Sequence, residues 1–151
     1  MTILRSYGLT LIRSLKLLVF FLFLLFLTVG CKKYKGPLPN VRVDFTIIPD
    51  DINYDLYLIG SHQYFTGGVN GIVVYRVGAG EFSAFDRACP YDWDDEDTPR
   101  VSVEDDGIIL ICEKCGTTYN ILDGGRIKGP SKYPLKQYYT RFDGVRLRIH
   151  S

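Results

Sequence analysis

Short runs of alternating hydrophobic and polar residues follow one another from residue 41 to the end of the chain. The first run, 41–47, places Val or Phe or Ile at every second position, which is the period-two pattern of a half-buried strand. Pro49 ends this run. A second short strand is expected at 56–59, and the stretch 64–71 is expected to be a loop with a Gly-Gly turn. No window shows a helical period.

Four hairpins are predicted in the remainder of the chain, because pairs of apolar runs are separated by turn residues. The turns are rich in Gly and Asp, and each of the last three contains the Asp-Gly pair that favours a tight β-turn. The paired runs are 71–77 with 81–88, 101–103 with 108–111, 119–122 with 126–128, and 138–142 with 145–149. The pattern therefore predicts an all-β domain of about nine or ten short strands.

The first thirty residues follow a different pattern. Three basic residues precede an unbroken apolar run, 17–27, and Gly30-Cys31 closes it. This run is shorter than the ~18 residues that span a bilayer, so it predicts a signal peptide. A cysteine directly after a small residue resembles the lipobox of bacterial lipoproteins, although Thr28 stands where Leu is usual. We expect lipid on Cys31; an ordinary signal peptide, or a plain anchor with an incidental cysteine, is the alternative.

Three segments are therefore predicted: a lipoprotein signal peptide at 1–30, a tether at 31–40 and a β domain at 41–151. The tether carries three lysines and two prolines, as expected of a solvated spacer. Acyl chains contribute ~0.8 kcal/mol per buried CH₂, so they would hold the protein at a membrane of the bacterial cell envelope. Lys32, rather than Asp, follows the cysteine, which favours the outer membrane by analogy with other bacteria.

Charge and composition exclude several functions. The whole chain has a formal net charge of +1, and without its basic leader it is slightly acidic, so no nucleic acid partner is expected. The sequence shows no Ser-His-Asp set and no phosphate-binding glycine loop, so no enzyme acting by itself is expected. His62 and His150 are expected to be surface or edge residues rather than metal ligands, because neither is near a cysteine in sequence.

Two cysteine-containing loops carry the candidate chemistry. Cys112 and Cys115 are three positions apart, a spacing that lets both sulfurs of a β-turn face one point, as in a metal knuckle. Cys89 opens an earlier loop whose acidic run, 92–97, lacks the glycine and closing glutamate of a calcium-binding loop. We expect this acidic run to face water.

From about Gly71 to Ile149 the chain resembles the Rieske iron–sulfur domains, in which Cys-x-His and Cys-x-x-His-Gly loops face each other. Cys89 and Cys112 match the two cysteines, with 20 residues (92–111) between Tyr91 and Cys112. The resemblance implies a Rieske-like antiparallel β sandwich or barrel. It also extends to a group of lipoproteins from Bacteroidetes-type bacteria. Further matches lie in the cluster loop and in the loop that covers the cluster: Gly116, Thr117, Tyr119, Gly129 and Pro130.

Both histidine positions of that pattern are changed, because Tyr91 and Cys115 stand there instead. The resemblance then implies an electron-transfer [2Fe–2S] site with non-standard ligation by Cys89, Tyr91, Cys112 and Cys115, working with an unidentified redox partner. Thr117, Tyr119, Gly129 and Pro130 would surround it. Three thiolates and a phenolate add negative charge, which lowers the reduction potential relative to a site with imidazole ligands.

Two alternatives stay open. Arg5 and Arg13 are far apart and no Arg-Arg pair exists, so a twin-arginine route for a folded protein is not indicated. A chain exported unfolded would arrive without its cluster, as a lipid-anchored binding module. A Cys89–Cys112 disulfide is then expected in the oxidising envelope, with Cys89–Cys115 or Cys112–Cys115 as other pairings. The last alternative is a structural zinc site on the three cysteines.

Overall fold

The computed structural model describes residues 16–20, 37–95, 97 and 99–151. It divides into two units, Met1–Lys33 and Tyr34–Ser151. Residues 16–20 of the first unit are helical. The rest of the predicted signal peptide, Cys31 and the first part of the tether lie outside the described residues. Within the described part of the chain, no helix combines the length and the apolar character needed to cross a bilayer.

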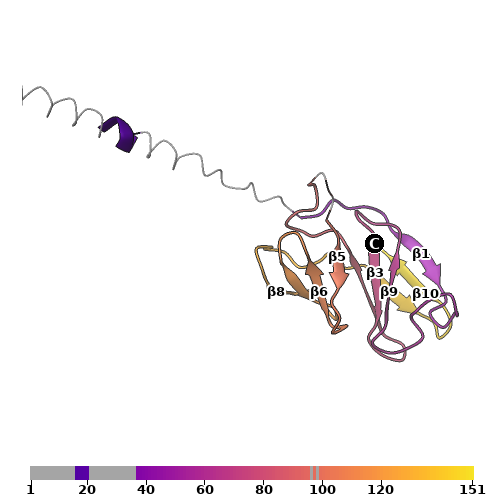
Figure 1. Cartoon of the computed structure of the whole chain (residues 1–151). Helices are drawn as coiled ribbons and strands as arrows, with labels where there is room; N and C mark the ends of the chain where they lie inside the picture. Colours follow the sequence, from indigo (N-terminus) through magenta and orange to yellow (C-terminus); the bar gives the residue numbers. More distant parts are fainter. Residues whose placement is uncertain (1–15, 21–36, 96, 98) are drawn as a thin grey trace, which may run out of the picture. The chain divides into compact units, whose positions relative to one another are not determined.

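The second unit is built from short antiparallel strands, which confirms the all-β prediction. The described residues form ten of them, and Figure 1 shows their arrangement. In chain order they are β1 (Asp44–Ile47), β2 (His62–Phe65), β3 (Ile72–Arg76), β4 (Phe82–Asp86), β5 (Val101–Val103), β6 (Ile109–Cys112), β7 (Thr118–Asn120), β8 (Arg126–Lys128), β9 (Tyr139–Phe142) and β10 (Leu147–His150).

The strands form three sheets, with the orders β1-β10-β9, β2-β3-β4 and β5-β6-β7-β8. The first two sheets are linked beside β4 and β9. There the Tyr138 amide donates to the Ala84 carbonyl at 2.9 Å and the Asp86 amide donates to the Lys136 carbonyl at 2.8 Å. In Figure 1, β5, β6 and β8 lie on one side of β3, and β1, β9 and β10 lie on the other.

All four predicted hairpins are confirmed, as β3–β4, β5–β6, β7–β8 and β9–β10. The hairpins form where predicted because their Asp and Gly residues stabilise the turns. In the β5–β6 turn, Asp106 Oδ1 accepts hydrogen bonds from the amides of Ile108 at 3.0 Å and Ile109 at 3.2 Å. Gly107, with φ of 75°, takes the left-handed conformation that the turn requires.

Two predictions near the start of the domain are wrong. The strand expected at 56–59 is a turn: Leu56 is fully buried, but Tyr57, Leu58 and Ile59 are exposed. The stretch expected to be a loop, 64–71, contains the end of β2, which pairs with β3. Its Gly-Gly turn, at φ of 126° and 64°, connects these two strands.

The core consists of two clusters of apolar side chains, one on each side of β3. All five residues of β3 are buried, and alternate side chains enter different clusters. Ile72 and Val74 belong to the cluster that includes residues of β1, β9 and β10. Val73 and Tyr75 belong to the second cluster, which includes Cys89 and Cys112 together with Val101, Leu110, Tyr119 and Ile121. The cysteine loops are thus continuous with an apolar core.

Asp86, at the end of β4, is a buried hydrogen-bond hub. Its carboxylate accepts from the amides of Val69 at 2.7 Å, Asn70 at 3.2 Å and Ala88 at 2.8 Å. It also accepts from the Tyr138 hydroxyl at 2.7 Å. Four donors satisfy the fully buried carboxylate, and together they fix the backbone that leads into the first cysteine loop.

Candidate metal centre

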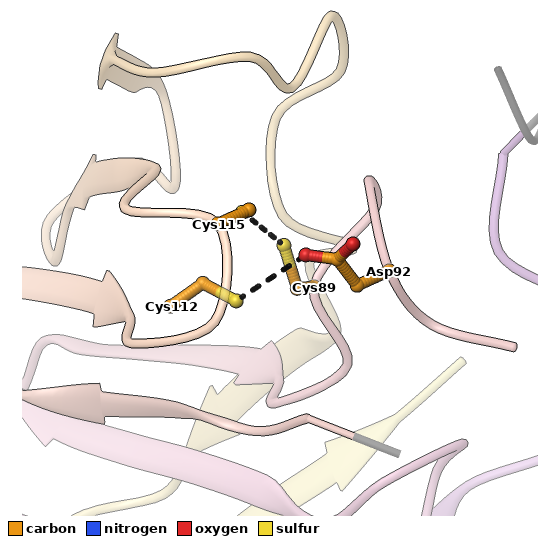
Figure 2. A group of neighbouring side chains, drawn as sticks. All are labelled: Cys89, Asp92, Cys112 and Cys115. Carbon is orange, nitrogen blue, oxygen red and sulfur yellow. Dashed lines mark hydrogen bonds between the residues drawn. The ribbon is translucent and has the colours of Figure 1, made fainter. Parts of the chain in front are cut away.

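The first cysteine loop begins directly after β4. Ala88 forms an isolated antiparallel bridge with Arg100, which closes the base of the loop. Inside it, the Asp92 amide donates to the Cys89 carbonyl at 3.0 Å, and the Asp95 amide donates to the Asp92 carbonyl at 3.0 Å. After these successive tight turns the Asp92 carboxylate points toward the cysteine side chains, as Figure 2 shows.

The second cysteine loop connects β6 to β7. The Gly116 amide donates to the Cys112 carbonyl at 2.8 Å, and the Cys112 amide donates to the Thr117 carbonyl at 2.9 Å. Gly116 has φ of 71°, which residues with a side chain adopt at a cost. The glycine after the Cys-x-x-Cys pair therefore lets the chain turn tightly enough to aim both sulfurs at one point.

The two loops bring four potential ligands together. One sulfur or carboxylate oxygen from each of Cys89, Asp92, Cys112 and Cys115 lies within 4.8 Å of all the others. The sulfurs of Cys89 and Cys115 approach to 3.6 Å, and the Cys112 sulfur lies 3.8 Å from Asp92 Oδ2. Figure 2 marks both contacts with dashed lines. Three of the four residues are buried, and Cys115 is partly exposed. The arrangement provides soft thiolate donors and one hard oxygen donor for a metal ion.

Two of the four residues predicted to surround the site, Thr117 and Tyr119, lie close to its sulfurs. The Tyr119 hydroxyl lies 3.6 Å from the Cys89 sulfur, and Thr117 Oγ1 lies 3.1 Å from the Cys115 sulfur. The loop that carries Gly129 and Pro130 packs on Thr117, because a Cβ added to Gly129 would lie 2.4 Å from the Thr117 Cα. Pro130 itself is exposed.

Tyr91 is half-buried and packs against the second core cluster. Its predicted role as a ligand stays a prediction. Neither histidine belongs to the four-residue group. The His62 ring contacts the Tyr64 ring, with centroids 5.2 Å apart, and the His150 ring stacks on the Tyr139 ring at 5.5 Å.

The prediction that the whole acidic run, 92–97, faces water is wrong for Asp92. Asp94 and Asp97 are exposed, as predicted, but Asp92 is fully buried. The tight turns after Cys89 direct its carboxylate inward. The sequence does hold a signal for this residue, because Cys89-x-x-Asp92 repeats the spacing of Cys112-x-x-Cys115.

The close packing of these groups shifts their proton affinities in opposite directions. Hydrogen bonding with the Cys112 thiol, and then with the backbone at Tyr91, lowers the pKa of the Cys89 thiol to about 6. The same contact with Cys89, together with burial, raises the pKa of Cys112. Burial raises the pKa of Cys115 and of Tyr119. A metal cation bound here would displace protons from the thiols, so metal binding is expected to weaken as the pH falls.

Comparisons with known proteins identify the fold. No protein-family model matches the chain, and no curated protein matches it. Among solved structures, it is similar to a chain of the complex of reduced oxygenase and oxidized ferredoxin in carbazole 1,9a-dioxygenase, with a TM-score of 0.50 and 19% identity over 72% of this chain and 93% of that one.

Two further structures show the same kind of likeness. One is the plasma membrane Rieske protein PetC3 from Synechocystis PCC 6803, with a TM-score of 0.48 and 19% identity over 60% of this chain and 86% of that one. The other is a putative NADH-dependent nitrite reductase small subunit from Mycobacterium tuberculosis, with a TM-score of 0.44 and 15% identity over 74% of this chain and 97% of that one. The domain has a Rieske-like fold, and identities this low extend the likeness to the fold alone.

Proposed function

We propose that this chain is a metal-binding protein of the bacterial cell envelope, held at the membrane by lipid on Cys31. Its metal would lie between the two cysteine loops. The observation that carries this proposal is the convergence of three sulfurs and one carboxylate within 4.8 Å, on loops far apart in sequence. Thiolates in such numbers select zinc, copper(I) or iron–sulfur groups over hard cations.

The choice of metal decides what the protein does. Iron at this site would make it an electron carrier that requires a redox protein as its partner, as the resemblance of its sequence implies. In that form Cys89, Tyr91, Cys112 and Cys115 would hold a [2Fe–2S] cluster, as the resemblance implies. Zinc has no redox chemistry, so a zinc-loaded domain would be a binding module with a metal-stabilised fold.

The proposal is tested by measuring the metal content of the protein after anaerobic purification from its native cell envelope. We expect stoichiometric metal by elemental analysis. Replacing Cys112 with serine removes a buried donor and is expected to lower metal occupancy at least about 10-fold, since even groups that only support a ligand affect metal affinity by about 10-fold or more. Metal-free wild-type protein from that source would contradict the proposal.

Cys31→Ser serves as the matched cysteine control. It removes the predicted lipid attachment site, so the protein should carry no fatty acid and keep its metal, because Cys31 precedes the β domain. Wild-type protein without fatty acid on Cys31 would contradict the lipid anchor without affecting the metal site.

The disulfide-bonded, metal-free form is a second candidate, and one distance favours a particular pairing. The sulfurs of Cys89 and Cys115 are 3.6 Å apart, so a modest movement would bring them to the ~2.05 Å of an S–S bond. Forming that bond takes two electrons and two protons from the thiols, and the oxidising envelope supplies the acceptor.

Thiol alkylation before and after reduction distinguishes this candidate from the metal site. For the metal-bound protein, we expect mass spectrometry of the denatured chain to show Cys89, Cys112 and Cys115 all alkylated without a reductant. A peptide pair joined through Cys89 and Cys115, in protein that contains no metal, would replace the metal-binding proposal with the disulfide form.

A further inference from the structure

The two cysteine loops present their potential ligands in the same way. Cys89 and Asp92 are three positions apart, and so are Cys112 and Cys115. Each pair begins a tight turn closed by a hydrogen bond to the carbonyl of its first cysteine. The pairs are separated by 19 residues, 93–111. This spacing falls within the range for two-knuckle zinc sites, with a carboxylate in place of one thiolate. Asp is an ordinary zinc ligand.

The distances between the donor atoms indicate whether the site would hold one metal ion or two. Around a single tetrahedral ion with metal–sulfur bonds of about 2.3 Å, neighbouring sulfurs lie about 3.8 Å apart. The contacts observed here are 3.6 Å between Cys89 and Cys115 and 3.8 Å between Cys112 and Asp92, with every donor within 4.8 Å of the others. The four donors are therefore spaced as the ligands of one ion.

A two-iron cluster requires a wider site. Its two pairs of ligands bind different irons, so the bridging sulfides lie between the pairs. Cys115 stands at the position that would serve the second iron, and Cys89 at a position that would serve the first. Their sulfurs are in contact in this structure, so the donors as placed do not fit the cluster that the fold family implies.

Asp92 is the donor that completes the set. Its side chain is fully buried, and one carboxylate oxygen faces the three sulfurs. The Cys112 sulfur lies 3.8 Å from Asp92 Oδ2, so this oxygen is placed as the fourth donor beside the three sulfurs.

We propose that Cys89, Asp92, Cys112 and Cys115 together hold one tetrahedral zinc-class divalent ion, and not a two-iron cluster. This inference rests on the proposed function that the site binds metal. Protein groups fill all four positions, which is the arrangement of a structural site rather than a catalytic one.

The stoichiometry of the full-length protein tests the number of ions. We expect one metal ion per chain and no acid-labile sulfide, and we expect cobalt(II) to bind one per chain with the intense visible bands of tetrahedral thiolate coordination. Two irons and two sulfides per chain would overturn the single-ion inference while leaving the metal-binding proposal intact. Protein that binds neither zinc, cobalt nor iron would overturn both.

Substitutions at Asp92 test the fourth ligand. Asp92→Asn is expected to weaken zinc binding by about 100-fold in a chelator competition, at the upper end of what outer groups contribute. Asp94→Asn, on an exposed side chain of the same loop, is expected to leave the affinity unchanged. Asp92→Cys should restore tight binding of one ion and strengthen the thiolate-to-cobalt absorption.

Asp92→Cys keeps the test decisive if Asp92→Asn fails to fold. If Asp92→Cys binds one cobalt ion with the same spectrum as the wild type, position 92 does not reach the metal and the inference fails. The same conclusion follows if folded Asp92→Asn retains wild-type affinity and an unchanged cobalt spectrum.

Discussion

Replacing Asp86 with alanine is expected to destabilise the domain by about 4 kcal/mol, because each buried donor left unsatisfied costs about 1–3 kcal/mol. The variant removes the acceptor for the three backbone amides and the Tyr138 hydroxyl at the end of β4. Urea unfolding followed by the fluorescence of Trp93, the single tryptophan, measures the loss.

Asp143→Ala is the matched control for this prediction. Asp143 also accepts hydrogen bonds from two backbone amides, those of Val145 at 2.9 Å and Arg146 at 2.7 Å, but its turn is exposed to solvent. Water can replace those bonds, so the expected loss is about 1 kcal/mol or less. Equal losses for the two variants would show that burial of the Asp86 hub contributes nothing to stability.

Replacing Gly129 with alanine is expected to destabilise the domain by about 4 kcal/mol, because overpacking costs about 1–3 kcal/mol and a side chain at positive φ adds about 1–2 kcal/mol. The added Cβ would lie 2.4 Å from the Thr117 Cα and 2.7 Å from its Oγ1, and Gly129 has φ of 104°. Thr117 also contacts the Cys115 sulfur, so metal occupancy should fall with stability. Urea unfolding and elemental analysis of the same sample measure both effects.

Gly107→Ala separates backbone strain from the close contact. Gly107 has φ of 75°, but a Cβ added there meets no atom within 4 Å. Gly107→Ala is therefore expected to lower the stability by only about 1–2 kcal/mol, the cost of a left-handed residue that has a side chain. A Gly129→Ala variant as stable as Gly107→Ala would mean that the covering loop moves away from Thr117 without cost.

The hairpins could be predicted from sequence because their turn residues act locally. Asp106 and Gly107, for example, form their turn through contacts within a few residues of one another. The segment 56–59 could not be assigned in the same way. Only Leu56 of this apolar run is buried, and it belongs to a core cluster with residues of β3 and β10 that are distant in sequence. Tertiary packing, rather than the local pattern, decides that segment.

The same distinction between local and tertiary signals applies to the residues of the candidate site. The three cysteines could be identified because sulfur at these spacings is a strong chemical signal. Asp92 was missed because it belongs to a run of acidic residues, and such runs usually face water. Its spacing from Cys89, and the turn that begins there, distinguish Asp92 from its exposed neighbour Asp94.

The strand order of the β1-β10-β9 sheet sets a limit on when this domain can fold. The central strand, β10, includes residues 147–150, and it pairs with β1 from the start of the domain. A growing polypeptide that has reached β9 still lacks the strand on which both of its neighbours depend. Such distant pairings are slow to form, so we expect the β1-β10-β9 sheet of the nascent protein to stay unformed until synthesis has passed position 150.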